Sequence, residues 1–131
     1  MSKKDYQKLT LAGLIAKAEQ KKAEKNKGKT GEFYVKSLDG TVTLKGVDTG
    51  LMADAGKMEN DEGNAYIVYQ CCIDPPLKDK ELQEAYGCGV PTDIVGKLFD
   101  PGEIAALSVE AAKLSGYFTD SVKSVSDTIK N

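Results

Sequence analysis

The side chains available for chemistry are restricted in this 131-residue chain. It contains no histidine and no arginine, and all 18 of its basic residues are lysines. Histidine is the commonest general base and zinc ligand, so catalysis would depend on carboxylates, lysines or thiols. Arginine supplies the bidentate fork that recognises phosphates and guanine edges, and that fork is missing as well. No paired catalytic motif occurs among the remaining residue types, and we predict a protein that is not an enzyme.

The three cysteines are the most reactive candidates that remain. Cys71 and Cys72 are adjacent and Cys88 stands alone, so none forms the Cys-x-x-Cys spacing of a zinc or redox site. A zinc site would also need a fourth ligand from elsewhere in the chain. An odd number of cysteines without a secretory signal favours reduced thiols in a cytoplasmic protein. We therefore expect buried, unreactive thiols, with no metal and no cofactor.

Two short segments have some features of ligand-binding loops but fail the tests for them. The acidic connector 59–64 would place Gly63 at position six of an EF-hand loop, and position one would then be Met58, which is not a calcium ligand. Residues 87–89 read Gly-Cys-Gly, without a third glycine in register and without a Walker lysine. Both segments are predicted to be ordinary turns.

Charge is distributed unevenly along the chain. Residues 1–30 hold nine lysines and three acidic residues, a balance of +6, whereas residues 31–131 hold nine lysines and 17 acidic residues, a balance of −8. The lysine-rich segment 19–31 is interpreted as a solvated face and linker. The alternative is an electrostatic arm for nucleic acid or an acidic partner, but the lack of arginine and aromatic residues there disfavours nucleic acid. No apolar run reaches the roughly 18 residues of a membrane span.

The most completely specified element is a helix from about Pro101 to Ser115. Asp100 is a preferred N-cap, and Pro101 suits the first helical position, where a missing N–H has no cost. Glu103 at the third position can reach back to the N–H of the cap, which completes a capping box. Gly116 suits the left-handed residue just past the end.

A second helix leads into this one and forms a corner with it. It is predicted to open at Val90-Pro91 and to carry an apolar stripe at Ile94, Val95, Leu98 and Phe99. Phe99, before the cap, and Ile104, at the fourth helical position, have the spacing of a hydrophobic staple, which fixes the angle between two helices.

A β-hairpin is predicted nearer the N-terminus, with strands at 33–37 and 42–45. Asp39-Gly40 between them is a pair favoured in two-residue type I′ turns. That turn places Val35 opposite Leu44 and Ser37 opposite Val42. One face of the hairpin then needs a cover of helices, because an isolated hairpin is marginal in water; its residues are Phe33, Val35, Val42 and Leu44.

The remaining elements complete an α+β, mainly helical prediction. A helix capped at Thr10 has its apolar face at Leu11, Leu14, Ile15 and Ala18 and frays by about Asn26. Short helices are expected at 47–58, capped at Asp48 or Thr49, and at 78–86, starting near Asp79, whereas 65–73 fits either a buried strand or a helix. Tyr117 and Phe118 are expected to pack back on the last helix. The predicted organisation is a basic helix and linker (1–31), a single domain of one hairpin and four to five short helices packed as a small bundle (32–118), and a weakly structured tail (119–131).

The order of these segments resembles the XkdN-like tail assembly chaperones of long-tailed phages and prophages of Gram-positive bacteria. The matching segments together cover most of residues 9–117; they are Leu9-Thr-Leu11, Phe33–Val42, Asp74–Leu82, Leu98–Ile104 and Leu114-Ser-Gly116. The resemblance implies a small cytoplasmic protein, absent from the finished virion, that binds the tape measure protein and keeps it soluble while the tail assembles. It also implies the tail tube protein as a further partner and leaves self-association open. An alternative in the same setting is a structural tail component, such as a tube or completion protein.

A chaperone of this kind needs an apolar groove or edge that accepts helical segments of a long partner. Two sets of apolar residues are candidates for that surface. The first lies at the predicted corner and consists of Leu98, Phe99, Ile104 and Leu107, although the pattern favours all four as core residues over an open groove. The second lies at helical spacing in the C-terminal tail, where a weak amphipathic segment could order on binding, and consists of Val122, Val125 and Ile129.

Overall fold

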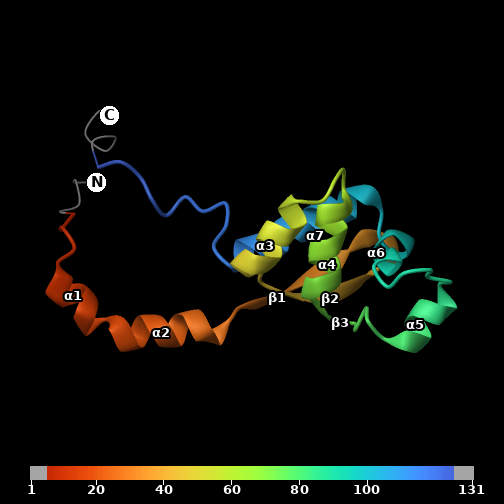
Figure 1. Ribbon diagram of the computed structural model, residues 1–131, viewed down its shortest axis with the longest axis horizontal. Helices are drawn as coiled ribbons and strands as arrows, with labels where there is room; N and C mark the ends of the chain where they lie inside the picture. The colour runs from red at the N-terminus through yellow and green to blue at the C-terminus, as the bar shows by residue number, and fades with distance from the viewer. Residues whose placement is uncertain (1–5, 126–131) are drawn as a thin grey trace. The chain divides into compact units, whose positions relative to one another are not determined.

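The computed structural model describes residues 6–125 (Figure 1). Contacts between Cα atoms group Lys29–Phe118 into one compact unit, which we call the body. The other unit combines Met1–Gly28 with Thr119–Asn131. Residues 6–28 are called the arm below, and residues 119–125 the tail.

The body contains one antiparallel sheet with the strand order β1-β2-β3. Strand β1 (Thr30–Val35) pairs with β2 (Gly40–Lys45), and β2 pairs on its other side with the short β3 (Cys72–Asp74). A 3-10 turn, η1 (Lys36–Leu38), joins the first two strands.

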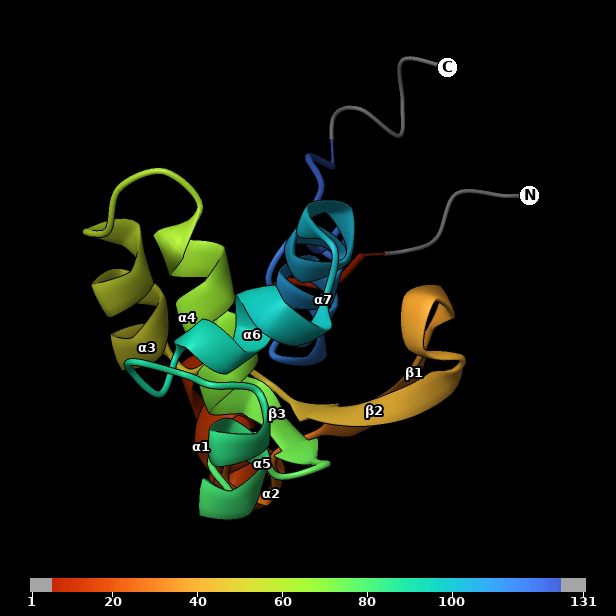
Figure 2. The same cartoon turned by 90° about the vertical axis from the view of Figure 1, so that its right-hand side faces the viewer.

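Helices cover one face of this sheet. Figure 2 shows α4 and α7 above the curved β1–β2 hairpin, with α6 in contact with both. The α+β, mainly helical prediction is confirmed. The helices of the body in its described part are α3 (Thr49–Gly56), α4 (Glu62–Cys71), α5 (Lys80–Ala85), α6 (Asp93–Leu98) and α7 (Pro101–Leu114).

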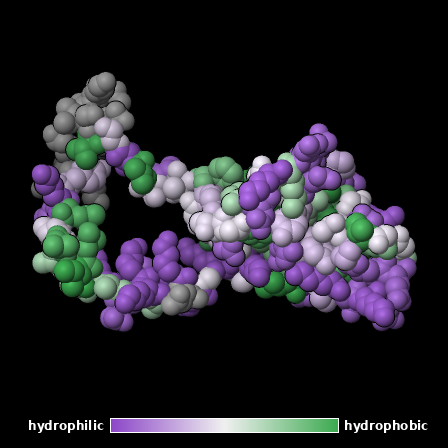
Figure 3. Space-filling model, viewed as in Figure 1, coloured by the Kyte–Doolittle hydropathy of each residue, from purple (hydrophilic) through white to green (hydrophobic). Residues whose placement is uncertain are grey.

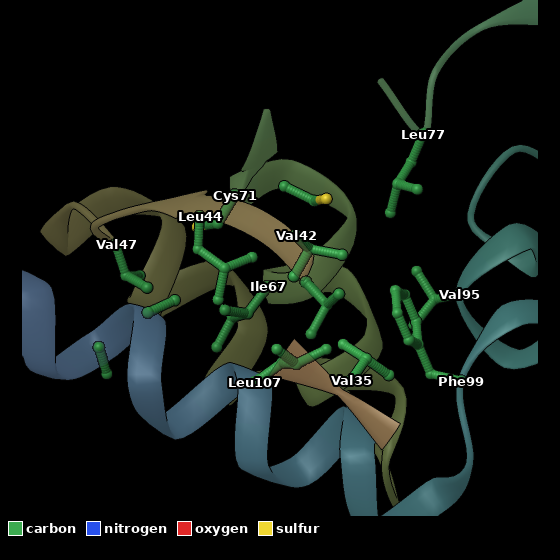
Figure 4. Packing of buried hydrophobic residues seen from close by; sticks show 14 of the residues in the cluster. Val35, Val42, Leu44, Val47, Ile67, Cys71, Leu77, Val95, Phe99 and Leu107 are labelled. Atoms are coloured by element: carbon green, nitrogen blue, oxygen red, sulfur yellow. The ribbon is translucent and has the colours of Figure 1, made fainter. Parts of the chain in front are cut away.

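The core forms where the hairpin meets α4, α6 and α7. Val42 and Leu44 of β2 are buried against this layer of helices, together with Val35 of β1. Figure 4 shows Leu107 of α7 directed toward Val35 and Ile67. The apolar face predicted for the hairpin is therefore the face that the helices cover.

The pairing register of the hairpin differs from the prediction. Val35 lies opposite Gly40, and Phe33 lies opposite Val42. The loop is longer than a type I′ turn, because Lys36–Leu38 form a 3-10 turn and only Asp39 has a positive φ, of 49°. The partner of Val35 moves by four positions, which is an even number, so every side chain keeps its predicted face.

The ambiguous segment 65–73 contains both a helix and a strand. It lies in α4 as far as Cys71, and from Cys72 the chain continues as β3, which pairs Cys72 with Leu44. The sequence prediction missed this third strand. Three residues are too few to show strand periodicity, and β3 exists because the edge of β2 is available to it.

Side chains mark the helix starts of the body much as predicted. Asp48 caps α3 by accepting a hydrogen bond from the Leu51 N–H at 2.7 Å, and Asp79 caps α5 through the Leu82 N–H at 2.9 Å. The helix predicted to open at Val90-Pro91 begins two residues later, at Asp93. The Asp93 carboxylate accepts hydrogen bonds from the backbone N–H groups of Gly89 and Val90, which holds those residues in a turn.

The loop around α5 is held by one buried side chain and one amide. Leu77 is completely buried, although it lies outside the regular elements. The Gln83 side chain donates to the carbonyl oxygens of Leu77 at 3.0 Å and Pro91 at 2.9 Å. It thereby links the two ends of the connection between β3 and α6.

Helix α7 ends close to the predicted place. Gly116 follows it with a φ of +89°, and the Tyr117 N–H donates to the Ala112 carbonyl at 3.1 Å. Tyr117 packs partly buried against the core, as expected. The same expectation is wrong for Phe118, whose side chain is 70% exposed.

The arm contains two consecutive helices, α1 (Leu11–Ala16) and α2 (Ala18–Lys27), with Lys17 between them. The Thr10 hydroxyl accepts a hydrogen bond from the Gly13 N–H at 3.0 Å, which confirms the predicted N-cap. Regular helix lasts to Lys27, so it extends slightly beyond the predicted fraying point near Asn26. Gly28 then leaves the helix with a φ of +72°.

Candidate partner-binding site

The apolar face of the arm is exposed along α1. The exposed fractions are 77% for Leu11, 50% for Leu14 and 67% for Ile15, and Leu9 just before the helix is 74% exposed. Figure 3 shows these apolar side chains gathered along α1. Soluble domains rarely present several large apolar side chains on one helical face, and such a face usually marks a binding surface.

Helix α2 continues the arm with a different character. Its sequence, Ala-Glu-Gln-Lys-Lys-Ala-Glu-Lys-Asn-Lys, has almost no apolar side chain, and Figure 3 shows its surface as hydrophilic. Lys21 forms an exposed ion pair with Glu24 at 3.6 Å, one turn away. The structure leaves residues 19–25 exposed, as expected of a solvated face, and the backbone is helical as far as Lys27, one residue past the predicted fraying point.

None of the residues in the core cluster comes from the arm. Every residue in it lies between Phe33 and Tyr117. The core of the body is therefore built from the body's own residues.

The corner between α6 and α7 has the local structure that was predicted. Asp100 and Glu103 form a capping box, in which a carboxylate oxygen of Glu103 accepts from the Asp100 N–H at 2.9 Å. Phe99 is buried, and Ile104 packs partly buried against the same core.

The four corner residues proposed as partner contacts differ in exposure. Phe99 is 3% exposed and Leu107 is 5% exposed, so both belong to the core. Leu98 and Ile104 are partly buried and reach the surface. Only these two could contact a partner without displacing core side chains.

Glu103 also has a role that the sequence did not reveal. Its carboxylate accepts hydrogen bonds from the Ser37 hydroxyl at 2.7 Å and from the Ser37 N–H at 3.1 Å. The hydrogen bond from the backbone of Asp100, together with those from Ser37, lowers the pKa of Glu103. One side chain therefore fastens the start of α7 to the hairpin loop, and only the tertiary structure brings the two segments together.

The tail candidates are exposed as far as the structure describes them. Val122 is 86% exposed and Val125 is 57% exposed, and residues 119–125 form no regular helix. Ile129 lies outside the described residues. Ordering of this segment on a partner stays a prediction.

The thiols and a surface depression of the body give little sign of chemistry. Burial raises the pKa of Cys71, and it raises the pKa of Cys72 to about 11, so both stay protonated near neutral pH. No group of three or more potential metal ligands occurs within residues 6–125. A depression of about 370 Å³ between the end of β2, α3 and α4 is open and lined largely by polar groups, among them Lys45, Asp48 and Asp54. Ligand pockets are usually deeper and more apolar.

A comparison with known protein families assigns the chain to one of them. The model of the phage XkdN-like tail assembly chaperone (TAC) family matches residues 14–130, which is most of the chain. The protein belongs to this family. The resemblance found in the sequence is thereby confirmed.

The fold of this tail assembly chaperone also occurs in a solved structure. It resembles the crystal structure of the protein yqbn, a structural genomics target, with a TM-score of 0.52 and 20% sequence identity. The similarity covers 69% of this chain and 87% of that one. At this identity the comparison concerns the fold alone. No curated protein matches the sequence.

The family assignment changes how the surfaces of the chaperone are interpreted. A tail assembly chaperone works on phage tail proteins, so its partners are proteins. No helix within residues 6–125 is long and apolar enough to cross a membrane. Surfaces that offer apolar side chains to another protein are therefore more relevant than the polar depression, and α1 of the arm carries several such side chains on one helical face.

Proposed function

We propose that this tail assembly chaperone binds the tape measure protein and keeps it soluble while tail tube subunits assemble around it. It acts by binding and not by catalysis. The observation that carries the proposal is the exposed apolar face of α1. A very long partner with apolar stripes associates with itself unless those stripes are covered, and an exposed apolar face is suited to cover them.

Two further surfaces are available for contact in this proposal. Leu98 and Ile104 extend the partly exposed edge of the α6–α7 corner. In the tail, Val122, Val125 and Ile129 provide apolar side chains that could become helical on a partner, as weak amphipathic segments do on binding. The buried Phe99 and Leu107 support the corner from within, where they keep α6 and α7 at a fixed angle.

The proposal also places the chaperone in the host cytoplasm and outside the mature virion, with the tail tube protein as a further partner. The alternative, a structural tail component, would leave the protein in purified particles. Mass spectrometry of purified particles separates the two, because a chaperone is absent and a tube or completion protein is present in many copies.

Co-expression tests the proposal directly. The full chain is expressed together with the tape measure protein of the same phage or prophage, and the soluble fraction of the tape measure protein is measured with and without the chain. We expect the soluble fraction to rise severalfold and the two proteins to copurify. An unchanged soluble fraction, with both proteins well expressed, would refute the proposed function.

A further inference from the structure

We propose that α1 and α2 together form one docking element for a helix of the partner that is apolar in one half and acidic in the other. This inference rests on the proposed function, since it names the partner segment that the chaperone covers. It assigns the contact to the arm, and the lysines of α2 become part of the site.

The apolar half of the element is a regular helical stripe. Leu11, Leu14 and Ile15 have the i, i+3, i+4 spacing of one helix face, and Ala18 continues it into α2. Each of the three larger side chains is at least half exposed. A stripe with this period is covered best by another helix, whose own ridge of side chains fits between the turns.

The second half of the element selects by charge. Residues 17–29 hold six lysines and two glutamates, a balance of +4. One of the glutamates, Glu24, already accepts a hydrogen bond from Gln20 at 3.2 Å and pairs with Lys21. The remaining positive potential favours acidic side chains on the partner and speeds its approach. A partner helix that continues past the apolar stripe therefore meets lysines on its next turns.

The length of the element sets the length of the partner segment. Leu11 to Lys27 comprises the six residues of α1, Lys17 and the ten residues of α2. Lys17 interrupts the helical geometry between the two helices, so their lengths are taken separately: at 1.5 Å per residue α1 spans about 9 Å and α2 about 15 Å, or roughly two and three helical turns. The segment we propose thus has two apolar turns followed by about three turns rich in aspartate and glutamate.

The same pattern argues against other occupants. The arm of a second copy in parallel would set lysines against lysines, and in antiparallel it would set lysines against the apolar stripe. Nucleic acid would contact the lysines but leave Leu11, Leu14 and Ile15 uncovered. An apolar and acidic helix satisfies both halves at once.

Two designed peptides of about five helical turns provide the probes. Both carry the same apolar stripe in one half, and the other half carries glutamates in one peptide and lysines in its counterpart. Binding to the full-length chain is measured by fluorescence anisotropy at low and high salt. We expect the glutamate peptide to bind at least about tenfold more tightly, and to lose this advantage at high salt.

Three variants of the full chain locate the contact. Leu14→Ser with Ile15→Ser removes the apolar stripe and should weaken binding of the glutamate peptide by at least about tenfold. Lys21→Glu with Lys25→Glu brings the charge balance of residues 17–29 from +4 to zero and should abolish the preference for the glutamate peptide, which a purely structural role would not produce. Val90→Ser with Val109→Ser is the matched control: it removes exposed apolar side chains from the body and should leave the affinity for both peptides unchanged.

The outcomes separate this inference from the proposed function. If the Leu14 and Ile15 variant is folded and still keeps the tape measure protein soluble, the arm is not the docking element, although the chaperone role stands. Equal binding of both peptides to the unaltered chain, or an undiminished preference for the glutamate peptide in the lysine variant, would also overturn the inference. A dimer of the isolated chain that the Leu14 and Ile15 variant abolishes would assign the stripe to a second copy instead.

Discussion

Replacement of Gly63 by alanine tests how closely α3 and α4 pack. Gly63 lies in the first turn of α4, and a Cβ atom added there would lie 2.6 Å from the carbonyl oxygen of Ala55 in α3 and 3.3 Å from its carbonyl carbon. Real Cβ atoms essentially never come so close, and the obstacle is backbone, which cannot rotate away. The two helices must separate by several tenths of an ångström. Overpacking of this kind lowers the free energy of unfolding by about 1–3 kcal/mol, and the better helix propensity of alanine offsets part of this loss.

The matched control is Gly96→Ala in α6. A Cβ at Gly96 meets nothing within 4 Å, and the residue has no positive φ. Alanine in a helix interior there should stabilise the protein by about 0.5–1 kcal/mol, because glycine loses more backbone entropy on folding. The same chemical change thus has opposite signs at the two positions.

Thermal and urea unfolding followed by circular dichroism measure both effects. We expect Gly63→Ala to lower the free energy of unfolding by about 1.5 kcal/mol and Tm by ~6–12 °C for a body of this size. Gly96→Ala should raise Tm by ~2–8 °C. If Gly63→Ala is as stable as the wild type, α3 and α4 do not approach as described, and the reasoning is refuted.

Three further predictions concern the corner and the thiols. Leu107→Ala should destabilise the body by about 3 kcal/mol in urea unfolding, because it leaves a cavity in the core; a loss below about 1 kcal/mol would instead indicate an exposed contact residue. Glu103→Gln should lower Tm relative to the wild type above about pH 4.5. The pKa of Glu103 is lower in the folded state than in the unfolded state, so its contribution to the free energy of unfolding is fully present above the ordinary pKa of glutamate and is lost as pH falls through the lowered pKa. A difference in Tm between wild type and variant that does not change from pH 7 to pH 3 would contradict this assignment. Maleimide at pH 7.5 should label the partly exposed Cys88 first and reach Cys71 and Cys72 only on unfolding, which mass spectrometry of peptides would show; equal rates would contradict the buried positions.

Local signals in the sequence were sufficient for most helix starts. Thr10, Asp48, Asp79 and the capping box around Asp100 act within three residues, so neighbouring residues alone determine them. The face of each element could also be predicted, because periodicity survives errors in register. The hairpin shows this most clearly, since its predicted turn was wrong and its predicted buried face was right.

Contacts between distant segments decided the rest. Strand β3 forms only because Cys72 reaches the free edge of β2, and Glu103 meets Ser37 across 66 positions of the chain. No local pattern contains such contacts.

The candidate site divides in the same way. The apolar stripe of α1 and the lysines of α2 are legible in the sequence, and so are the corner residues Phe99 and Leu107. Periodicity shows that a face is apolar but cannot show what covers it. Packing in three dimensions buries Phe99 and Leu107 in the core and leaves Leu14 and Ile15 exposed. The sequence by itself thus determined which residues are apolar, where helices start and which family the protein belongs to, whereas the tertiary structure decided which apolar faces remain open to a partner.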